Sequence, residues 1–398
     1  MKKYEEIFLK LMKKSLLNRI VELEFNDFNE WDNVRQLSEI HQVSPMIYDA
    51  GHIYIEPEQL KLFWKRQMFM QTTMQIQRTI EFSKMYNLLK ENDIKALVFK
   101  GIICRNTYPK SDLRISGDED ILIKSNDLLK VDQIFTEKGY VRDKEILEGI
   151  DEVGYRNLKN GSYIEVHTKL FGDDSVYSFL NDEFNDVFET SIDIEIDGVS
   201  YSTFETTTHL FYLFTHAYKH FVHGGFGLRQ VSDMMMFMHK YGNMIDYIKL
   251  NSLLNKYHFE SFWFNLLDIA EKYLGYSYEL SNYTRSSLKL DSSDLLADLL
   301  DSGIFGQSSM ERKHSANMTL SALDNSSTTT SIFKSLFPSV SYIKNNYEYV
   351  NKCILLLPIG YIHRILNYLK NRKNNHASSS IEIGKKRIEL LKKYDLVK

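Results

Sequence analysis

The chain has 398 residues, of which 43% are hydrophobic and 26% are charged. These proportions are ordinary for a globular protein, so they exclude the fibrous and intrinsically disordered classes. The formal net charge of -4 provides no general attraction to nucleic acid. The two cysteines, Cys104 and Cys353, are too few and too far apart for a disulfide framework or a cysteine zinc site.

The sequence carries no signal for a membrane or for export. It has no run of about 18 apolar residues that would predict a transmembrane helix. Its first residues mix acidic and basic side chains where a signal peptide has an apolar core. We therefore expect a cytoplasmic protein. The 25 Tyr and 24 Phe, with only 18 Gly and 5 Pro, favour a helix-rich chain, and its length suggests two or three domains.

Residues 1–92 are predicted to form an N-terminal helical segment. Apolar residues at helical spacing indicate short helices over residues 1–50, and Pro45 is expected at a helix start. A longer helix is predicted over residues 57–91, and we interpret its broad apolar face as core packing. That face comprises Leu60, Phe63, Trp64, Met68, Met70, Met74, Ile76, Ile80, Phe82, Met85, Leu88 and Leu89.

The pattern changes to an α+β core over residues 93–205. The apolar run at 94–99 is typical of a buried strand and ends in a Lys-Gly turn. A second strand is predicted over 120–124 and a helix over 127–138.

Two hairpins complete the predicted core. Residues 152–169 contain two strand-like runs around Asn160-Gly161, a dipeptide typical of a type I′ turn. A second hairpin is predicted around Asp197-Gly198.

Helical periodicity returns over residues 206–300, which we predict to be a helical domain. Residues 301–398 are predicted to be a polar linker followed by a basic helical segment. From Arg364 to Lys398 there are ten basic and three acidic residues, a local net charge of +7. This tail could be a packed helix with a solvated charged face, or it could contact an anionic membrane surface or nucleic acid.

Three carboxylates in the α+β core form a candidate metal site. Asp118 and Asp120 are two positions apart at the start of a predicted strand, so both side chains leave the same face. Two like charges there repel unless a cation neutralises them, and oxygen ligands suit Mg²⁺. Glu165 on a later strand supplies a third carboxylate. An isolated Asp-x-Asp is also typical of a solvated acidic turn, so the order of the surrounding elements carries the prediction.

That order resembles the polymerase-β-like nucleotidyltransferase superfamily, and it is most similar to a bacterial family of stand-alone nucleotidyltransferases. The motifs that carry the resemblance are Lys100-Gly101, Tyr108-Pro109, Arg114, Gly117-Asp118-Glu119-Asp120 and Glu165-Val166-His167. It extends through the later helical segments, over about residues 40–390. It implies an α+β fold: a polymerase-β-type nucleotidyltransferase core with a small mixed sheet, flanked by N-terminal helices and a C-terminal helical domain.

The resemblance implies a Mg-dependent nucleotidyltransferase that moves a nucleoside monophosphate from an NTP, such as ATP, to an acceptor hydroxyl. It implies that Asp118, Asp120 and Glu165 bind two Mg²⁺ ions and that Glu165 also accepts the hydroxyl proton. The acceptor is then a small molecule, a sugar, a peptide or a protein. No specific nucleic acid partner is expected.

The resemblance also implies roles for residues around the carboxylates. Those expected to bind nucleotide or phosphate are Lys100, Gly101, Arg114 and Gly117. Those expected to support the site are His167, His216, His220, Arg229 and Asp233. Alternatives stay open, since Lys100 could form a surface ion pair and Arg114 could clamp its own loop. Arg229 and Asp233 are four residues apart on a predicted helix, where an ion pair is expected.

Two positions depart from the family pattern. Ile102 follows Gly101 where a serine is frequent, and Glu119 occupies a position that is usually apolar. Glu119 must therefore point away from the metal face, and it needs a partner if it is buried. These departures support a rival interpretation, a catalytically degenerate module that binds nucleotide or regulates a partner.

A stripe of histidines supports a second rival. His209, His216, His220 and His223 fall on one side of a predicted helix. They could be hydrogen-bonded core residues, face the nucleotide, or bind zinc in a metal-dependent hydrolase. The glutamate of the H-E-x-x-H motif is missing, because Ala217 follows His216.

Overall fold

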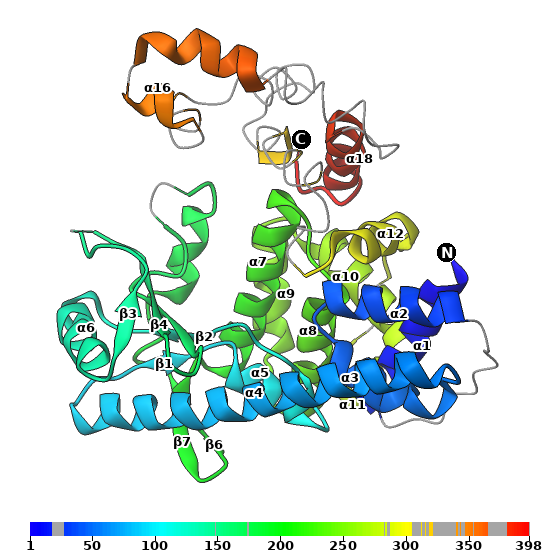
Figure 1. Cartoon of the computed structure of the whole chain (residues 1–398), viewed down its shortest axis with the longest axis horizontal. Coiled ribbons are helices and arrows are strands. Elements are labelled where there is room, and N and C mark those ends of the chain that lie inside the picture. The colour runs from blue at the N-terminus through cyan, green and yellow to red at the C-terminus, as the bar shows by residue number, and fades with distance from the viewer. Residues whose placement is uncertain are drawn as a thin grey trace. The chain divides into compact units, whose positions relative to one another are not determined.

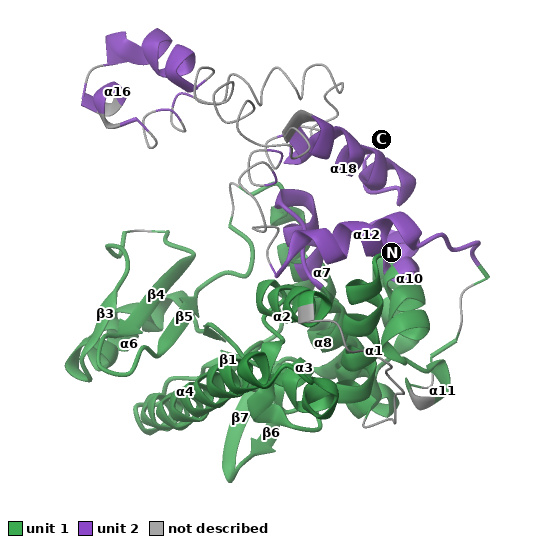
Figure 2. Ribbon diagram, turned by 45° about the vertical axis from the view of Figure 1, so that its right-hand side comes forward, with its two compact units in different colours: residues 1–216, 228–254, 266–287 green, residues 217–227, 255–265, 288–398 purple. Residues whose placement is uncertain are grey.

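Figure 1 shows the computed structural model of the chain. It describes residues 1–17, 28–147, 149–172, 175–281, 283–284, 287–304, 347–352, 354–364 and 380–397 and, between 305 and 346, residues 312, 315, 318–320, 340 and 343. Two compact units are distinguished in Figure 2: residues 1–216, 228–254 and 266–287 form unit 1, and residues 217–227, 255–265 and 288–398 form unit 2. Most of the predicted polar linker lies outside the described residues, and the four-part domain division stays a prediction.

Unit 1 begins with three short helices, α1 (Lys3–Leu17), α2 (Phe28–Ile40) and α3 (Ser44–Gly51), followed by a 3-10 turn, η1 (His52–Tyr54). The prediction of short helices is confirmed for the described part of residues 1–50. Pro45 lies in the first turn of α3, where its missing N–H leaves no helical hydrogen bond unmade.

The long helix α4 (Glu58–Glu91) confirms the predicted element, but its apolar face is core only in part. The buried members of that face are Leu60, Trp64, Phe82, Met85 and Leu89. The exposed members are Phe63, Met70, Met74, Ile76 and Ile80. Trp64 near the start of α4 donates to Ser44 of α3, and Lys130 of α6 (Leu128–Glu137) donates to the Asn92 carbonyl just beyond the end of α4. In the middle of α4, Gln75 is buried and accepts the Ser116 N–H, while the apolar side chains from Met70 to Ile80 on that face stay exposed. Periodicity alone does not reveal this. Figure 1 shows α4 as a long helix beside the sheet.

A five-stranded mixed sheet forms the centre of the α+β core, in the order β1-β2-β5-β4-β3. The strands are β1 (Leu97–Val98), β2 (Glu119–Leu122), β3 (Tyr140–Arg142), β4 (Glu152–Asn157) and β5 (Tyr163–His167). Strands β2 and β5 are parallel neighbours, and the other pairs are antiparallel. The connecting elements are α5 (Ile102–Arg105), η2 (Ser111–Leu113), η3 (Ser125–Asp127) and α6 (Leu128–Glu137). The predicted small mixed sheet is confirmed.

Both predicted hairpins are present, although one turn differs from its prediction. In the hairpin of β6 (Ile192–Ile196) and β7 (Val199–Thr203), Asp197 and Gly198 both have positive φ, as a type I′ turn requires. Between β4 and β5 the Asn157 N–H donates to the Ser162 carbonyl, which closes a four-residue loop. Of the four loop residues only Gly161 has positive φ, so the predicted two-residue type I′ turn is wrong there.

Helices account for most of the remaining described chain, in agreement with the predicted helix-rich α+β class. They are η4 (Ser178–Phe184), α7 (Thr206–His223), α8 (Leu228–Tyr241), η5 (Gly242–Met244), α9 (Tyr247–Lys256), α10 (Glu260–Ile269), the π-turn η6 (Ala270–Leu274), α11 (Tyr278–Ser281), α12 (Ser293–Ser302), α16 (Glu348–Lys352), η7 (Ile354–Leu356) and α18 (Ser380–Lys393). Within the described residues, none of the helices is long and apolar enough to cross a bilayer.

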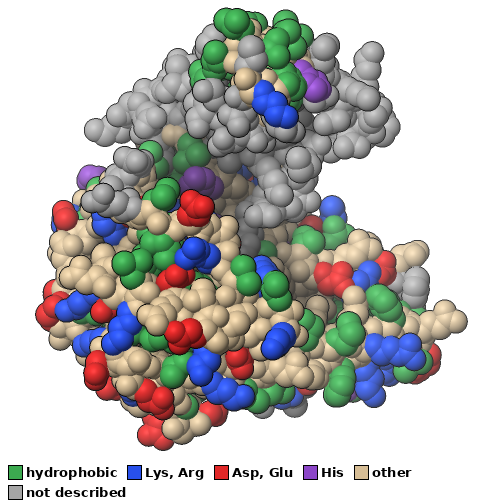
Figure 3. Space-filling model, turned by 60° about the vertical axis from the view of Figure 1, so that its left-hand side comes forward, with side chains coloured by type: hydrophobic (Ala, Val, Ile, Leu, Met, Phe, Trp, Pro, Cys, Tyr) green, Lys and Arg blue, Asp and Glu red, His purple; other side chains and the backbone are tan. Residues whose placement is uncertain are grey.

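The basic C-terminal segment contributes α18 to unit 2. Ile388 and Leu391 of α18 are buried, and Lys393 forms ion pairs with Asp291 and Asp294 at 2.8 and 2.7 Å. This part of the tail is therefore a packed helix with a charged outer side. Figure 3 shows acidic and basic side chains interspersed over one face of the molecule. Contact of the tail with a membrane surface stays a prediction.

His209 connects α7 to the first strand of the sheet. Its Nε2 donates to the Phe99 carbonyl at 2.8 Å, and its Nδ1 lies 3.1 Å from the Thr203 hydroxyl. Phe204 and Phe237 pack against the ring. Burial disfavours the imidazolium and lowers the pKa of His209 to about 4. This histidine of the predicted stripe is a neutral core residue.

His209 should make the stability of the protein depend on pH. Its folded pKa lies below the unfolded value of about 6.5, so the unfolded state binds more protons between pH 4 and 6.5. The stabilisation is full above pH 6.5 and is lost as the pH falls toward 4, by at most about 3 kcal/mol. Denaturant titrations from pH 4 to 7.5 should show a smaller pH slope for His209→Gln than for wild type. The exposed His258→Gln variant is the control, and an equal slope in all three proteins would contradict the assignment.

Candidate active site at the start of strand β2

Asp120 lies at the centre of the candidate site. It is a β2 residue, and its parallel register partner on β5 is Glu165, so the two carboxylates leave the sheet on the same face. The Asp120 side chain is almost fully buried, and Lys100 Nζ lies 2.7 Å from its Oδ1. Lys100 Nζ is close enough to form an ion pair, but within the described residues no donor has hydrogen-bond geometry toward either Asp120 oxygen. A buried carboxylate with free lone pairs is the expected state of a cation ligand.

Three side chains at this place could share a metal ion. Asp120, Glu165 and His167 each offer one ligand atom, and these atoms all lie within 4.8 Å of one another. His167 Nε2 is 3.4 Å from Asp120 and 3.7 Å from Glu165, and it also lacks a hydrogen bond within the described residues. Two oxygen ligands with one imidazole fit a divalent cation. The sequence predicts Asp118 as the third ligand, whereas the structure groups His167 with the other two.

Asp118 lies just before β2 and is half-buried. Burial, followed by the negative charge of Asp120, raises the pKa of Asp118 to about 6. The adjacent Gly117 is exposed, and a Cβ there would meet nothing within 4 Å. Gly117 therefore leaves open space next to the carboxylates.

Lys100 connects the carboxylates to α7. Besides its ion pair with Asp120, its Nζ lies 3.3 Å from His216 Nε2, and the His216 ring packs against Tyr212 one turn earlier. Burial lowers the pKa of Lys100, but the Asp120 carboxylate more than offsets this and the pKa is raised. The ion pair of Lys100 is therefore not a surface one, since its Asp120 partner is buried and the Lys100 side chain is 19% exposed. His220 belongs to the part of α7 in unit 2, and its predicted role stays a prediction.

Glu119 points to the opposite side of β2, as expected for its position between the two aspartates. Its carboxylate pairs with Arg105 at 2.6 Å and accepts the Ile102 N–H at 2.8 Å. Gly101 has φ +49°, and a Cβ on it would lie 1.9 Å from Glu119 Oε2. The need for glycine at this turn therefore comes from the buried Glu119 carboxylate. Approach of the Gly101 backbone to a phosphate stays a prediction.

Arg114 is held by a carboxylate on α8. Its Nε and Nη2 donate to the two oxygens of Asp233 at 3.0 and 2.6 Å, and the Tyr108 hydroxyl donates to Asp233 Oδ1 at 2.6 Å. Arg114 therefore clamps its own loop, which was the alternative to a phosphate-binding role. The predicted ion pair of Arg229 with Asp233 does not form, because Asp233 is already occupied.

Two further residues of the site were missed at the level of sequence. Arg105 is buried one turn after Gly101, and the requirement that a buried Glu119 have a partner could have pointed to it. Glu152 on β4 is the register partner of His167, and its Oε2 lies 3.6 Å from His167 Nδ1. Once the loop length of the hairpin is known, the pairing of β4 with β5 places Glu152 opposite His167.

The histidine stripe shows no metal site. Among the described residues, the only group of three or more potential ligands is the one formed by Asp120, Glu165 and His167. The zinc alternative for the stripe therefore finds no support in the described chain.

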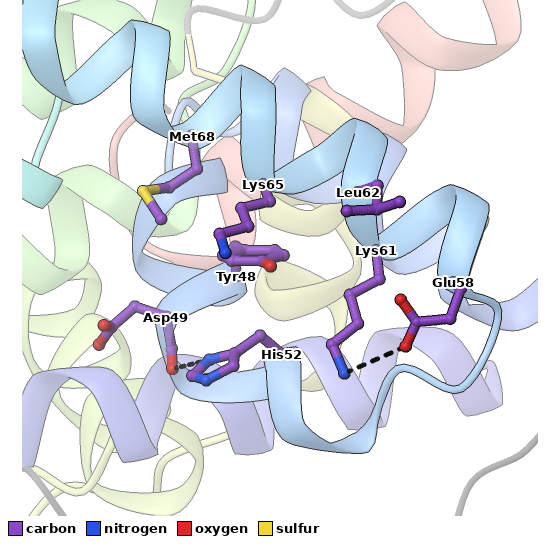
Figure 4. Close-up of a pocket in the computed structure, with 8 residues that line it drawn as sticks. All are labelled: Tyr48, Asp49, His52, Glu58, Lys61, Leu62, Lys65 and Met68. Carbon is purple, nitrogen blue, oxygen red and sulfur yellow. Dashed lines mark hydrogen bonds and ion pairs between the residues drawn. The ribbon is translucent and has the colours of Figure 1, made fainter.

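A pocket of about 320 Å³ lies elsewhere in unit 1, between α3 and α4 (Figure 4). Its lining residues are Tyr48, Asp49, His52, Glu58, Lys61, Leu62, Lys65 and Met68. None of the sequence-predicted site residues is among them. Several lining groups already have partners, since His52 Nδ1 lies 3.0 Å from the Asp49 carbonyl and Lys61 pairs with Glu58 at 3.9 Å.

The tight contact at Gly101 yields a stability prediction. Gly101→Ala should destabilise the protein by about 2 to 4 kcal/mol, because the new Cβ collides with Glu119 and the backbone keeps a positive φ. Gly117→Ala is the matched control and should stay within about 0.5 kcal/mol of wild type, since its Cβ meets open space. Chemical denaturation measures both, and equal stabilities of the two variants would refute this account of the turn.

Comparison with known proteins gives one family match. The family model described as "Uncharacterised nucleotidyltransferase" matches residues 27–275. No curated protein matches the chain. A crystal structure of an antigenic nucleotidyltransferase-like protein from Paracoccidioides brasiliensis shares 12% identity with a TM-score of 0.30, over 52% of this chain and 96% of that one. A TM-score of 0.30 is too low to indicate a shared fold. Because the family match spans more than half of its residues, the chain belongs to this family of nucleotidyltransferases.

Proposed function

We propose that the protein transfers a nucleoside monophosphate from an NTP, such as ATP, to an acceptor hydroxyl, with Mg²⁺ at the carboxylates of β2 and β5. The observation that carries this proposal is the pair of buried Asp120 oxygens without an in-line donor, next to Glu165 and His167. Lys100 supplies a counter-charge to Asp120 at 2.7 Å, and the carboxylate lone pairs that accept no hydrogen bond within the described residues remain available to a metal ion. The family match supports the reaction class.

Asp120, Glu165 and His167 would hold one ion, and Asp118 beside them would help to hold a second. Bound Mg²⁺ would stabilise negative charge on the attacking and leaving oxygens of the phosphoryl transfer. Glu165 is the most exposed of the three grouped ligands, with a side chain 22% accessible, and it would accept the proton of the acceptor hydroxyl. Lys100 would turn from Asp120 to the nucleotide phosphates when a metal replaces it.

We also propose that the core is of the polymerase-β type and that the acceptor is a small molecule, a sugar, a peptide or a protein. The sheet with parallel β2 and β5, carrying Asp120 and Glu165 at one register position, supports this proposal. Glu119 does not weigh against activity, because Arg105 neutralises it on the other side of the sheet. We propose no specific nucleic acid partner.

Replacement of Asp120 tests the proposed reaction. Asp120→Asn should lower NTP-dependent release of pyrophosphate by about 100-fold or more, because the amide removes the central negative charge from the metal site. The exposed Asp112→Asn variant is a matched control and should keep wild-type activity. Pyrophosphate release is measured with each of the four NTPs and a panel of hydroxyl acceptors. Equal activity of wild type and Asp120→Asn would exclude the proposed site.

Metal binding gives a second test that needs no acceptor. Mg²⁺ or Mn²⁺ at about 100 times its dissociation constant should stabilise the folded protein by about 2.7 kcal/mol, seen as a rise in Tm. Asp120→Asn should abolish this rise, whereas Asp112→Asn should retain it. An unchanged Tm of the wild-type protein in metal and in chelator would count against the metal site.

A further inference from the structure

Arg229 is a buried cation whose hydrogen-bond partners, among the residues that the structure describes, are neutral. It is 6% exposed, and its Nη1 donates to Gln42 Oε1 and to the Ile115 carbonyl, both at 2.8 Å. Its Nε is buried and has no hydrogen-bond partner within the described residues. A buried guanidinium normally makes several charge-assisted bonds, whereas within the described residues no carboxylate accepts a hydrogen bond from Arg229.

The surroundings of Arg229 make the charge more costly. Asp233 is the nearest carboxylate along α8, but it is already paired with Arg114. Burial, followed by repulsion from the Arg114 charge, lowers the pKa of Arg229 to about 10. Arg229 also lies in the first turn of α8, a 14-residue helix, where the helix dipole disfavours a cation and favours an anion.

Arg229 is close to the candidate active site. The Ile115 carbonyl that it contacts precedes Asp118 by three residues, and the charges of Arg229 and Asp118 influence each other. Arg114, the arginine in the sequence motif, has two of its donors on Asp233 and a third on Ser116. Of the two arginines, Arg229 is therefore the one with donor capacity to spare.

We propose that Arg229 binds a non-bridging phosphate oxygen of the nucleoside triphosphate. This inference rests on the proposed function, because it takes the triphosphate to be the anion that reaches Asp118. The phosphate accepts hydrogen bonds from the Arg229 guanidinium and lies at the N-terminal end of α8. One anion thereby balances the charge of the guanidinium and the positive end of the helix dipole. Arg114 is a structural residue that fixes the loop before β2.

The test compares Arg229→Met with Arg114→Met in the full chain. The probes are inorganic tripolyphosphate and ATP, each with and without Mg²⁺, titrated by calorimetry, and each variant is also melted. We expect Arg229→Met to bind both probes about 10- to 100-fold more weakly, with a Tm equal to or above that of wild type. Arg114→Met should lose Tm, because it leaves Asp233 buried without its cation. Arg229→Lys should recover part of the affinity, since lysine keeps the positive charge but lacks the planar, bidentate donor geometry of the guanidinium.

The outcomes separate this inference from the proposed function. Weaker tripolyphosphate binding by Arg229→Met supports the inference even if no NTP yields pyrophosphate, in which case only the proposed reaction fails. Wild-type affinity of Arg229→Met for both probes overturns the inference, even if the enzyme is active. The inference is likewise overturned if the Tm of Arg229→Met falls as far as that of Arg114→Met while its folded fraction binds both probes with wild-type affinity. Arg229 would then be a structural residue. A wild-type protein that binds neither probe overturns both.

Discussion

Two buried carboxylates on consecutive positions of one short strand impose the main constraint on the core. Glu119 and Asp120 leave β2 on opposite faces, and both are almost fully buried. Each needs a cation, and both cations come from the same segment after β1: Lys100 for Asp120 and Arg105 for Glu119. Gly101 separates these cations, and only glycine avoids a collision with the Glu119 carboxylate at this turn. The strand, the turn and α5 are therefore one electrostatic unit, because removing any charge leaves another buried without a partner.

The helices of unit 1 are attached to this unit by buried polar contacts. In α7, His209 donates to the Phe99 carbonyl and His216 reaches Lys100. In α8, Asp233 holds Arg114 and so fixes the loop that enters β2. Buried polar groups of this kind specify one arrangement, since each alternative packing would leave a donor or acceptor unsatisfied. The carboxylates are thereby held on rigid elements, as a site for metal and phosphate chemistry requires.

Local patterns in the sequence predicted the elements better than they predicted the partners. The hairpins, the long α4 and the strand of Asp120 follow from turn dipeptides and apolar runs, which are local signals. The Arg114–Asp233 pair joins residues 119 positions apart, and helical spacing suggested the wrong arginine for Asp233. The exposed middle of α4 was missed for a related reason, because an apolar stripe does not say whether a neighbour covers it. His167 was expected near the site, but its place beside Asp120 depends on the register of β2 with β5.

The hydrogen-bond geometry of the buried charges distinguishes the residues that hold the structure from those of the candidate site. Arg105, Arg114 and Arg312 are buried arginines with carboxylate partners at 2.6 Å, and their role is to hold the structure. Asp120 and Arg229 differ, because within the described part of the chain the Asp120 oxygens accept no hydrogen bond and the Arg229 Nε donates none. These two defects have opposite signs, and Asp118 links them electrostatically. A metal-bound triphosphate carries both complementary charges, the cation for the carboxylates and the phosphate oxygens for the guanidinium. The proposed ligand would therefore bind both the Asp120 oxygens and the Arg229 Nε, which lack hydrogen bonds within the described residues.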